Sequence, residues 1–108
     1  MSELRGSERR YLRGLGNALR PVVTVGKDGA SDALLAKLRA ELAAHELVKV
    51  RLAGEDREER EALGRQLAMA SASEWVGRIG GVALLFRAHP DPARRRIELP
   101  KRATPDPL

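Results

Sequence analysis

Apolar residues recur at intervals of three and four positions in three stretches of the chain, and this period predicts three helices. The first is expected over residues 7–19, with the Ser7 hydroxyl as its N-cap. The second is expected over residues 32–44, capped by Ser31. Asp56 is expected to open the third, which runs to about residue 72. Each helix has one apolar side, so all three should pack against a common core.

Other stretches have the patterns of β-strands. Residues 22–25 are almost continuously apolar, which favours the buried centre of a sheet over an exposed edge. In "LVKVRLA" apolar and polar residues alternate, so Lys49 and Arg51 should lie on an outward face. Two further strand-like segments flank Gly80 and Gly81, a pair of residues typical of a hairpin turn.

The order of these elements, α-β-α-β-α-β-β, predicts the fold class. Strands joined through helices run parallel, and the terminal hairpin adds an antiparallel pair. We therefore expect a single α/β domain over residues 7–87, with a mixed four-stranded sheet packed by helices. Residues 1–6 are expected to form a flexible N-terminus. Residues 88–108 hold a basic cluster and five of the six prolines, which predicts an extended tail rather than a packed element.

Composition narrows the choice of partner. The chain has 20 lysines and arginines against 15 acidic residues, a formal net charge of +5. This balance favours a polyanionic partner, with nucleic acid ahead of an anionic membrane surface. No apolar run is long enough to cross a bilayer, and the charged start lacks the apolar core of a signal peptide. We therefore expect a cytoplasmic protein without a membrane partner.

The sequence gives little support to cofactor, metal or catalytic chemistry. It has no cysteine, and His45 and His89 show no ligand spacing. His45 is expected at the end of the second helix, where an imidazolium can interact with terminal carbonyls. No nucleophile, base and orienting group occur together. We expect no enzyme activity, no cofactor, no metal and no small-molecule substrate.

The stretch Gly26-Lys27-Asp28-Gly29 lies between a predicted strand and a predicted helix, and it has two interpretations. The two glycines would let a phosphate approach the backbone, and Lys27 would add a positive charge. Asp28 does not fit, because a carboxylate repels a phosphate. The alternative is an ordinary turn with positive φ at Gly26 or Gly29, which the spacing alone favours. The glycine spacing matches neither a P-loop nor a dinucleotide fingerprint.

Charge is segregated along the chain, which favours a binding face over uniform solvation. The segment "EDREERE" at residues 55–61 carries five carboxylates against two arginines. Basic residues gather elsewhere. Those expected on the binding face are Arg9, Arg10, Arg13, Arg20, Lys49, Arg51 and Arg87.

Aromatic residues are scarce in this chain. Tyr11, Trp75 and Phe86 are the only three, and each is expected in the core. Domains that recognise bases by stacking usually present two or three aromatic rings on one sheet face. We therefore expect recognition of backbone and shape more than of bases.

Four segments in order carry a resemblance to a known family: "LRGLGNALRPVVTVGKDG", "AHELVKVRLAGEDRE", "GRIGGVALLFR" and "RRRIELP". With these, the chain resembles the CRM domain, the chloroplast RNA splicing and ribosome maturation family, in its stand-alone bacterial YhbY-like form. The resemblance implies an αβαβαββ fold similar to the C-terminal domain of translation initiation factor three. It also implies binding of structured RNA and association with large-subunit (50S) ribosomal precursors.

The resemblance also assigns candidate site residues. The family's GxxG loop, likened to that of KH domains, falls on Gly26, Lys27, Asp28 and Gly29. The basic surface around it carries over to Arg9, Arg10, Arg13, Lys49, Arg51 and Arg87. Asp28 departs from the family's frequent Asn, Gly80-Gly81 from its Gly-Lys, and Phe86 from its Tyr.

Two functions of different classes therefore follow. The leading one is a non-enzymatic, monomeric RNA-binding protein that assists assembly of the large ribosomal subunit by gripping phosphates of ribosomal RNA. The alternative is an adaptor that docks on a protein partner, with a basic face that only keeps it in solution.

Overall fold

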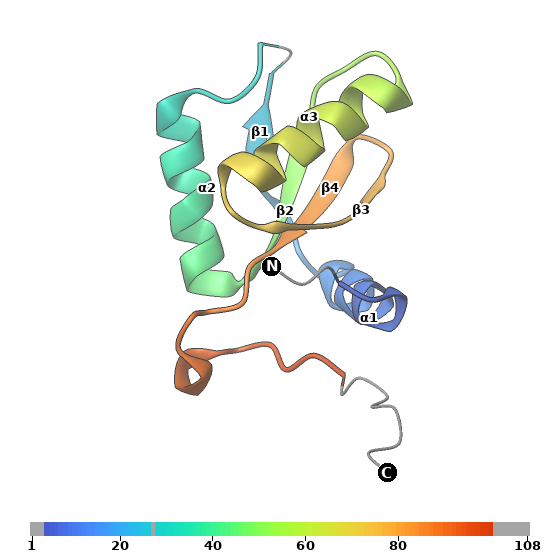
Figure 1. Ribbon diagram of the computed structural model, residues 1–108. Helices are drawn as coiled ribbons and strands as arrows, with labels where there is room; N and C mark the ends of the chain where they lie inside the picture. The colour runs from blue at the N-terminus through green and yellow to red at the C-terminus, as the bar shows by residue number, and fades with distance from the viewer. Residues whose placement is uncertain (1–3, 27, 101–108) are drawn as a thin grey trace.

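The computed structural model describes residues 4–26 and 28–100 of the chain. These residues form one mixed four-stranded sheet with three α-helices around it (Figure 1). The elements in chain order are α1 (Gly6–Gly16), β1 (Pro21–Val25), α2 (Asp32–His45), β2 (Leu47–Leu52), α3 (Arg57–Ala70), β3 (Glu74–Ile79), β4 (Val82–Phe86) and a 3₁₀-helix (Pro92–Arg94). The predicted fold class and element order are confirmed.

The sheet has the strand order β1-β2-β4-β3. β1 and β2 run parallel through the α2 crossover, whereas β4 runs antiparallel to both β2 and β3. The apolar pattern of residues 22–25 predicts a strand at the centre of the sheet, and that prediction is wrong, because β1 is an edge strand. Its side chains explain the misleading pattern: Val23 and Val25 are buried, whereas Thr24 is exposed.

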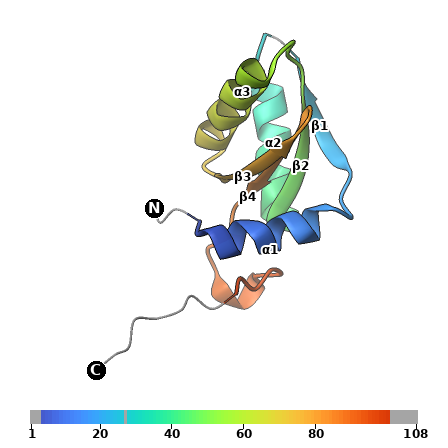
Figure 2. The ribbon, with the colours of Figure 1, turned by 90° about the vertical axis from the view of Figure 1, so that its right-hand side faces the viewer.

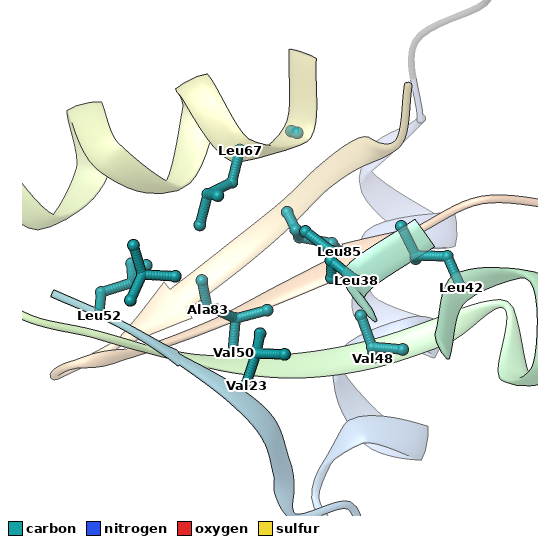
Figure 3. Packing of buried hydrophobic residues seen from close by; sticks show 11 residues of the cluster. Val23, Leu38, Leu42, Val48, Val50, Leu52, Leu67, Ala83 and Leu85 are labelled. Atoms are coloured by element: carbon teal, nitrogen blue, oxygen red, sulfur yellow. The ribbon is translucent and has the colours of Figure 1, made fainter. Parts of the chain in front are cut away.

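Alternate residues of the strands form two separate hydrophobic clusters. The first cluster lies between the sheet and helices α2 and α3 (Figure 3). It consists of Val23, Val25, Leu38, Leu42, Val48, Val50, Leu52, Leu67, Ala68, Ala83 and Leu85. The second cluster lies where α1 and residues 88–100 pack on the sheet. It consists of Leu4, Leu12, Leu47, Val76, Leu84 and Phe86, with Ala88, Ile97 and Leu99 against it.

Local capping sets the starts of the helices. The Ser31 hydroxyl accepts from Leu34 N at 3.1 Å and begins α2, and Asp56 Oδ1 accepts from Glu59 N at 2.8 Å and begins α3. The first helix differs from the prediction. It begins before Ser7, and the Glu8 carboxylate accepts from Arg5 N at 2.7 Å.

Both ends of the described chain are packed, against the expectation for residues 1–6 and 88–108. Leu4 is 8% exposed in the second cluster. Residues 88–100 lie with α1 at the end of the sheet away from the β1–α2 connection (Figure 2). The expected extended tail is therefore wrong for residues 88–100, and residues 1–3 and 101–108 lie outside the described ranges.

A single carboxylate holds the C-terminal segment. Glu46, 1% exposed, follows α2 and accepts from His89 N at 2.7 Å, Arg96 N at 2.6 Å and Ile97 N at 2.8 Å. Burial acts to raise the pKa of Glu46, but these three N–H groups and the nearby His89 together hold the pKa below its ordinary value. Glu46 therefore remains charged and bonded near neutral pH.

Candidate functional site

The uncovered part of the α1 face of the sheet forms a groove of about 320 Å³. Its walls come from the C-terminal half of α1, the segment that leads into β1, and strands β2, β3 and β4. Four of the cationic residues that line it are Arg13, Arg20, Lys49 and Arg51, and a fifth is Arg78. No lining residue carries a carboxylate. We call this feature the cationic groove.

Strand alternation brings the two β2 cations to the groove. Val48, Val50 and Leu52 are buried in the first cluster, so Lys49 and Arg51, which alternate with them, face the other way. The parallel register then places Pro21 beside Lys49 and Thr24 beside Arg51. Arg20, which directly precedes Pro21, is thereby carried to the same place.

Helix α1 supplies the remaining cation, and glycines allow the close approach. A Cβ on Gly16 would lie 2.7 Å from a methyl carbon of Leu84, so a glycine here lets the helix sit directly on β4. A Cβ on Gly77 would lie 3.6 Å from Arg13 Cδ, which places the Arg13 side chain along β3. The bare strand surface at Gly77 thus forms part of the wall beside Arg13.

Apolar residues also line the groove. They are Leu19, Pro21, Ile79, Val82 and Leu84, and we call this apolar lining the floor. Ile79 is 74% exposed and Leu19 36% exposed, so these side chains face water in the free protein. Asn17, at the C-cap of α1, also lines the groove and brings a side-chain amide.

Like charges gathered in one depression create a positive potential that nothing on its own walls neutralises. Low-dielectric apolar walls focus such a field and favour a polyanion there. Arg78 also lines the groove, but its Nη1 donates to Gly80 O at 2.5 Å. Because Arg78 also pairs with Ala83 of the first cluster, the groove cations Arg13, Arg20, Lys49 and Arg51 are the four on which the positive potential depends.

The GxxG stretch forms a turn at the carboxyl edge of β1. Gly29 N donates to Gly26 O at 3.0 Å, and Gly29 has φ +89° whereas Gly26 does not have positive φ. One loop amide is therefore used inside the turn. Asp28 is exposed, and Lys27 lies outside the described residues. A Cβ at Gly26 or Gly29 would meet nothing within 4 Å, so the surface there is open.

The turn lies at the end of the sheet toward which the groove runs. Ala53 N donates to Val25 O at 2.9 Å, and Leu52 N donates to Gly81 O at 2.7 Å. The β1–α2 connection, the β2–α3 connection and the β3–β4 hairpin therefore meet at one edge (Figure 1). Arg51, paired with Thr24, is the groove cation closest in register to that edge.

The structure does not bring every expected cation to the groove. Arg10 is exposed on α1. Arg9 lines a separate hollow of about 430 Å³ together with Arg65, Glu74 and Trp75. Arg87 is exposed after β4, at the end of the sheet away from the hairpin, and its N–H donates to Glu46 O at 2.8 Å.

Sequence reasoning missed the apolar floor. The signal was present, because Ile79 and Val82 pair across β3 and β4 and share the face of Lys49 and Arg51. A register shift between Trp75 and Gly77 hides this alternation in β3. Because of this shift, the alternation of side chains in the first half of β3 is out of step with the alternation in the second half.

The three aromatic residues occupy different environments. Phe86 is 3% exposed, as expected for a core residue. Trp75 packs against the first cluster, with the Arg65 guanidinium carbon 5.2 Å from its ring centroid. Tyr11 is 41% exposed, so the expectation that it lies in the core is wrong.

The described ranges contain neither a candidate metal site nor a candidate membrane-spanning helix. Residues 4–26 and 28–100 contain no group of three or more potential ligands that could hold a metal ion. No helix among them is both long and apolar enough to span a membrane.

Comparison with known proteins identifies the family. The model of the CRS1/YhbY (CRM) domain matches residues 4–87. The chain belongs to the CRS1/YhbY (CRM) domain family. A probable RNA-binding protein of Pseudomonas aeruginosa is 38% identical over 85 residues, 79% of this chain and 82% of that one. An RNA-binding protein of Haemophilus influenzae is 31% identical over 94% of this chain and its own whole length.

A solved structure has the same fold. The solution structure of a hypothetical protein from Staphylococcus aureus matches with a TM-score of 0.78 at 30% identity. The match covers 90% of this chain and 99% of that protein.

Proposed function

We propose that this CRM domain binds RNA and that the cationic groove grips its phosphates. The observation that carries the proposal is the meeting of four cations from α1, the α1–β1 segment and β2, with no carboxylate among the lining residues. Phosphate contacts by Lys and Arg dominate nucleic-acid affinity. The relatives from Pseudomonas and Haemophilus are named as RNA-binding proteins, which supports the same partner here.

The GxxG turn extends the proposed surface beyond the groove. Lys27 would add a charged contact, and the open backbone at Gly26 and Gly29 would allow close approach of a phosphate. Asp28, exposed in this turn, opposes that contact. We therefore propose the groove as the main phosphate site and the turn as a secondary one.

The RNA we propose is that of large-subunit ribosomal precursors, and the role is assistance in assembly in the cytoplasm without catalysis. Because the groove offers charges rather than exposed aromatic rings, interactions with the RNA backbone should dominate the affinity. Affinity should then fall linearly with salt on logarithmic axes.

The decisive experiment removes two groove cations together. In Lys49→Ala/Arg51→Ala, the logarithmic salt slope of RNA binding should decrease by about 0.7 to 0.9 for each phosphate that the protein no longer neutralises. The matched control is Lys37→Ala/Arg57→Ala, which removes the same charge from exposed positions on α2 and α3. Fluorescence anisotropy with labelled ribosomal RNA fragments measures both. Equal losses of affinity in the two double variants would mean that net charge alone attracts RNA.

The turn is tested separately with Lys27→Ala and Gly29→Val. The first should lower the salt slope by no more than the amount for a single phosphate, and the second places a β-branched residue at a φ of +89°. A folded Gly29→Val variant with full RNA affinity would limit the GxxG stretch to a structural turn.

The cellular partner is tested by sedimentation of lysates. The protein should migrate with large-subunit precursors and leave that fraction after ribonuclease treatment. Co-purification with a protein that survives nuclease, together with no RNA binding at moderate salt, would favour the adaptor function instead.

A further inference from the structure

We infer that the groove takes an unpaired RNA strand and seats a nucleobase on its apolar floor. This inference rests on the proposed RNA binding and specifies which form of RNA the groove accepts. The observation behind it is the pairing of a cationic wall with a floor that faces water in the free protein.

A double helix would leave the apolar floor largely uncovered. In a duplex the bases are stacked inside, and the phosphates and sugars form the outer surface. A duplex could therefore contact Arg13, Arg20, Lys49 and Arg51 but would leave Ile79 and Leu19 against water or phosphate. An unpaired strand presents flat base faces, which can cover apolar side chains while the phosphates meet the cations.

The size of the groove agrees with one inserted base. Its volume of about 320 Å³ is near the lower end of pockets that bind small organic groups. The most exposed floor residue, Ile79, lies at the hairpin end of β3, beside Val82 on β4. A base seated there would remove their side chains from water, which is favourable in proportion to the apolar area covered.

Asn17 provides a polar group for the edge of that base. Its side-chain amide both donates and accepts hydrogen bonds, as the Watson–Crick edges of bases do. Among the residues that line the groove it is the only neutral one with a polar side chain. The base would therefore meet Asn17 at its edge and the floor on its face.

The experiment compares Ile79→Ser with Met69→Ser. Ile79 is 74% and Met69 84% exposed, so neither serine should disturb the fold, and Met69 lies on α3 outside the groove. Each variant is titrated with a short unstructured oligoribonucleotide and with the duplex that it forms with its complement. A third probe is the same strand with abasic nucleotides, which keeps the phosphates.

Ile79→Ser should weaken binding of the intact strand about fivefold, because the apolar area that a base would cover on Ile79 is lost. Its salt slope should not change, because no charge is removed. Met69→Ser should bind like the natural chain, and the duplex and the abasic strand should not distinguish the two variants. Asn17→Ala should reduce differences in affinity among homopolymer strands.

Two results would overturn the inference, and they are distinct from failure of the proposed function. One is an equal affinity of Ile79→Ser and Met69→Ser for the intact strand. The other is a duplex that binds as tightly as the strand and is weakened equally by Ile79→Ser. In both cases RNA still binds, so the groove would remain a phosphate site that does not seat a base. Absence of binding to all three probes would instead reject the proposed function itself.

Discussion

The two faces of the sheet are built by alternate residues of the same strands, yet only one of them is fully covered. On the α2 and α3 face, Val48, Val50 and Leu85 are at most 1% exposed. On the other face, α1 and residues 88–100 cover one end and leave the other end open as the cationic groove.

Exposure on the open face rises along β2 and β3 toward the hairpin end of the sheet. In β2 it increases from buried Leu47 through half-buried Lys49 to exposed Arg51. In β3 it increases from buried Val76 to exposed Ile79. Where the cover by α1 and residues 88–100 ends, the side chains on this face of β2 change from an apolar leucine to cations. The candidate site is therefore the uncovered half of a packing face, so stability and binding should be separable by substitution.

The largest effect on stability is expected on the covered face. Leu38→Ala removes a side chain with 0% exposure from the first cluster and should lower the free energy of unfolding by about 2–5 kcal/mol. Urea denaturation measures the loss, and RNA affinity of the folded variant should not change. Ile79→Ala, on the open face, is the control and should stay within about 0.5 kcal/mol of the natural chain. A similar loss from both would contradict the difference between the faces.

The next effect concerns the covered end of the α1 face. Glu46→Gln keeps the shape of the side chain but replaces an acceptor with a donor, so one of the three N–H groups of residues 89, 96 and 97 is left without its partner. We expect a loss of about 1–3 kcal/mol in unfolding free energy. Hydrogen exchange should show faster exchange at those amides. Glu41→Gln, on the preceding helix α2, is the matched control and should leave those amides protected.

The same carboxylate predicts a pH dependence. Because the pKa of folded Glu46 is lowered from 4.5, its contribution to stability is fully present above that value. It is lost as the pH falls through the folded pKa, when the protonated group gives up its bonds to the C-terminal segment. Amide protection at residues 96 and 97 should decrease in that acidic range, and in Glu46→Gln this pH dependence should be absent. Protection that is constant across that range would contradict the prediction.

How much of the fold could be predicted from sequence depends on how far apart along the chain the interacting residues lie. The caps at Ser31 and Asp56 are local, because each hydroxyl or carboxylate bonds an amide three residues away, and both predictions are confirmed. The edge position of β1 could not be predicted, because strand order depends on which helix covers which face. The hydrogen bonds of Glu46 join residues 43 to 51 positions apart, so no local pattern indicates them.

The candidate site likewise has one part that the sequence predicts and another part that depends on the fold. Strand alternation alone places Lys49 and Arg51 on an outward face. That Arg13 and Arg20 meet them depends on where α1 crosses the sheet, and the apolar floor depends on how far α1 extends. The pattern of charges therefore predicts the kind of partner, whereas the shape of the groove requires the fold.

A smaller effect on stability is expected when two glycines of α1 are each replaced by alanine. Gly14 is exposed, and Gly14→Ala should stabilise the protein by up to about 1 kcal/mol through helix propensity. Gly16→Ala should instead destabilise it by about 1 kcal/mol, because the new methyl group presses on Leu84 in the second cluster. Thermal unfolding of both variants measures the opposite signs. Stabilisation by both would mean that α1 can move away from β4 at no cost in stability.

The smallest effect on stability is expected in the groove itself. Lys49→Ala/Arg51→Ala removes side chains that the structure leaves half-buried or exposed, so unfolding free energy should change by less than about 0.5 kcal/mol. The sign should depend on salt. At low salt the variant should gain stability relative to the natural chain, since the remaining cations of the groove repel one another less. At high salt this gain should vanish, because screening already weakens the repulsion in the natural protein. Urea titrations at two ionic strengths measure both. A loss of stability as large as that of Gly16→Ala, independent of salt, would show that these cations belong to the packed structure, and the contrast between the faces would then not separate folding from binding.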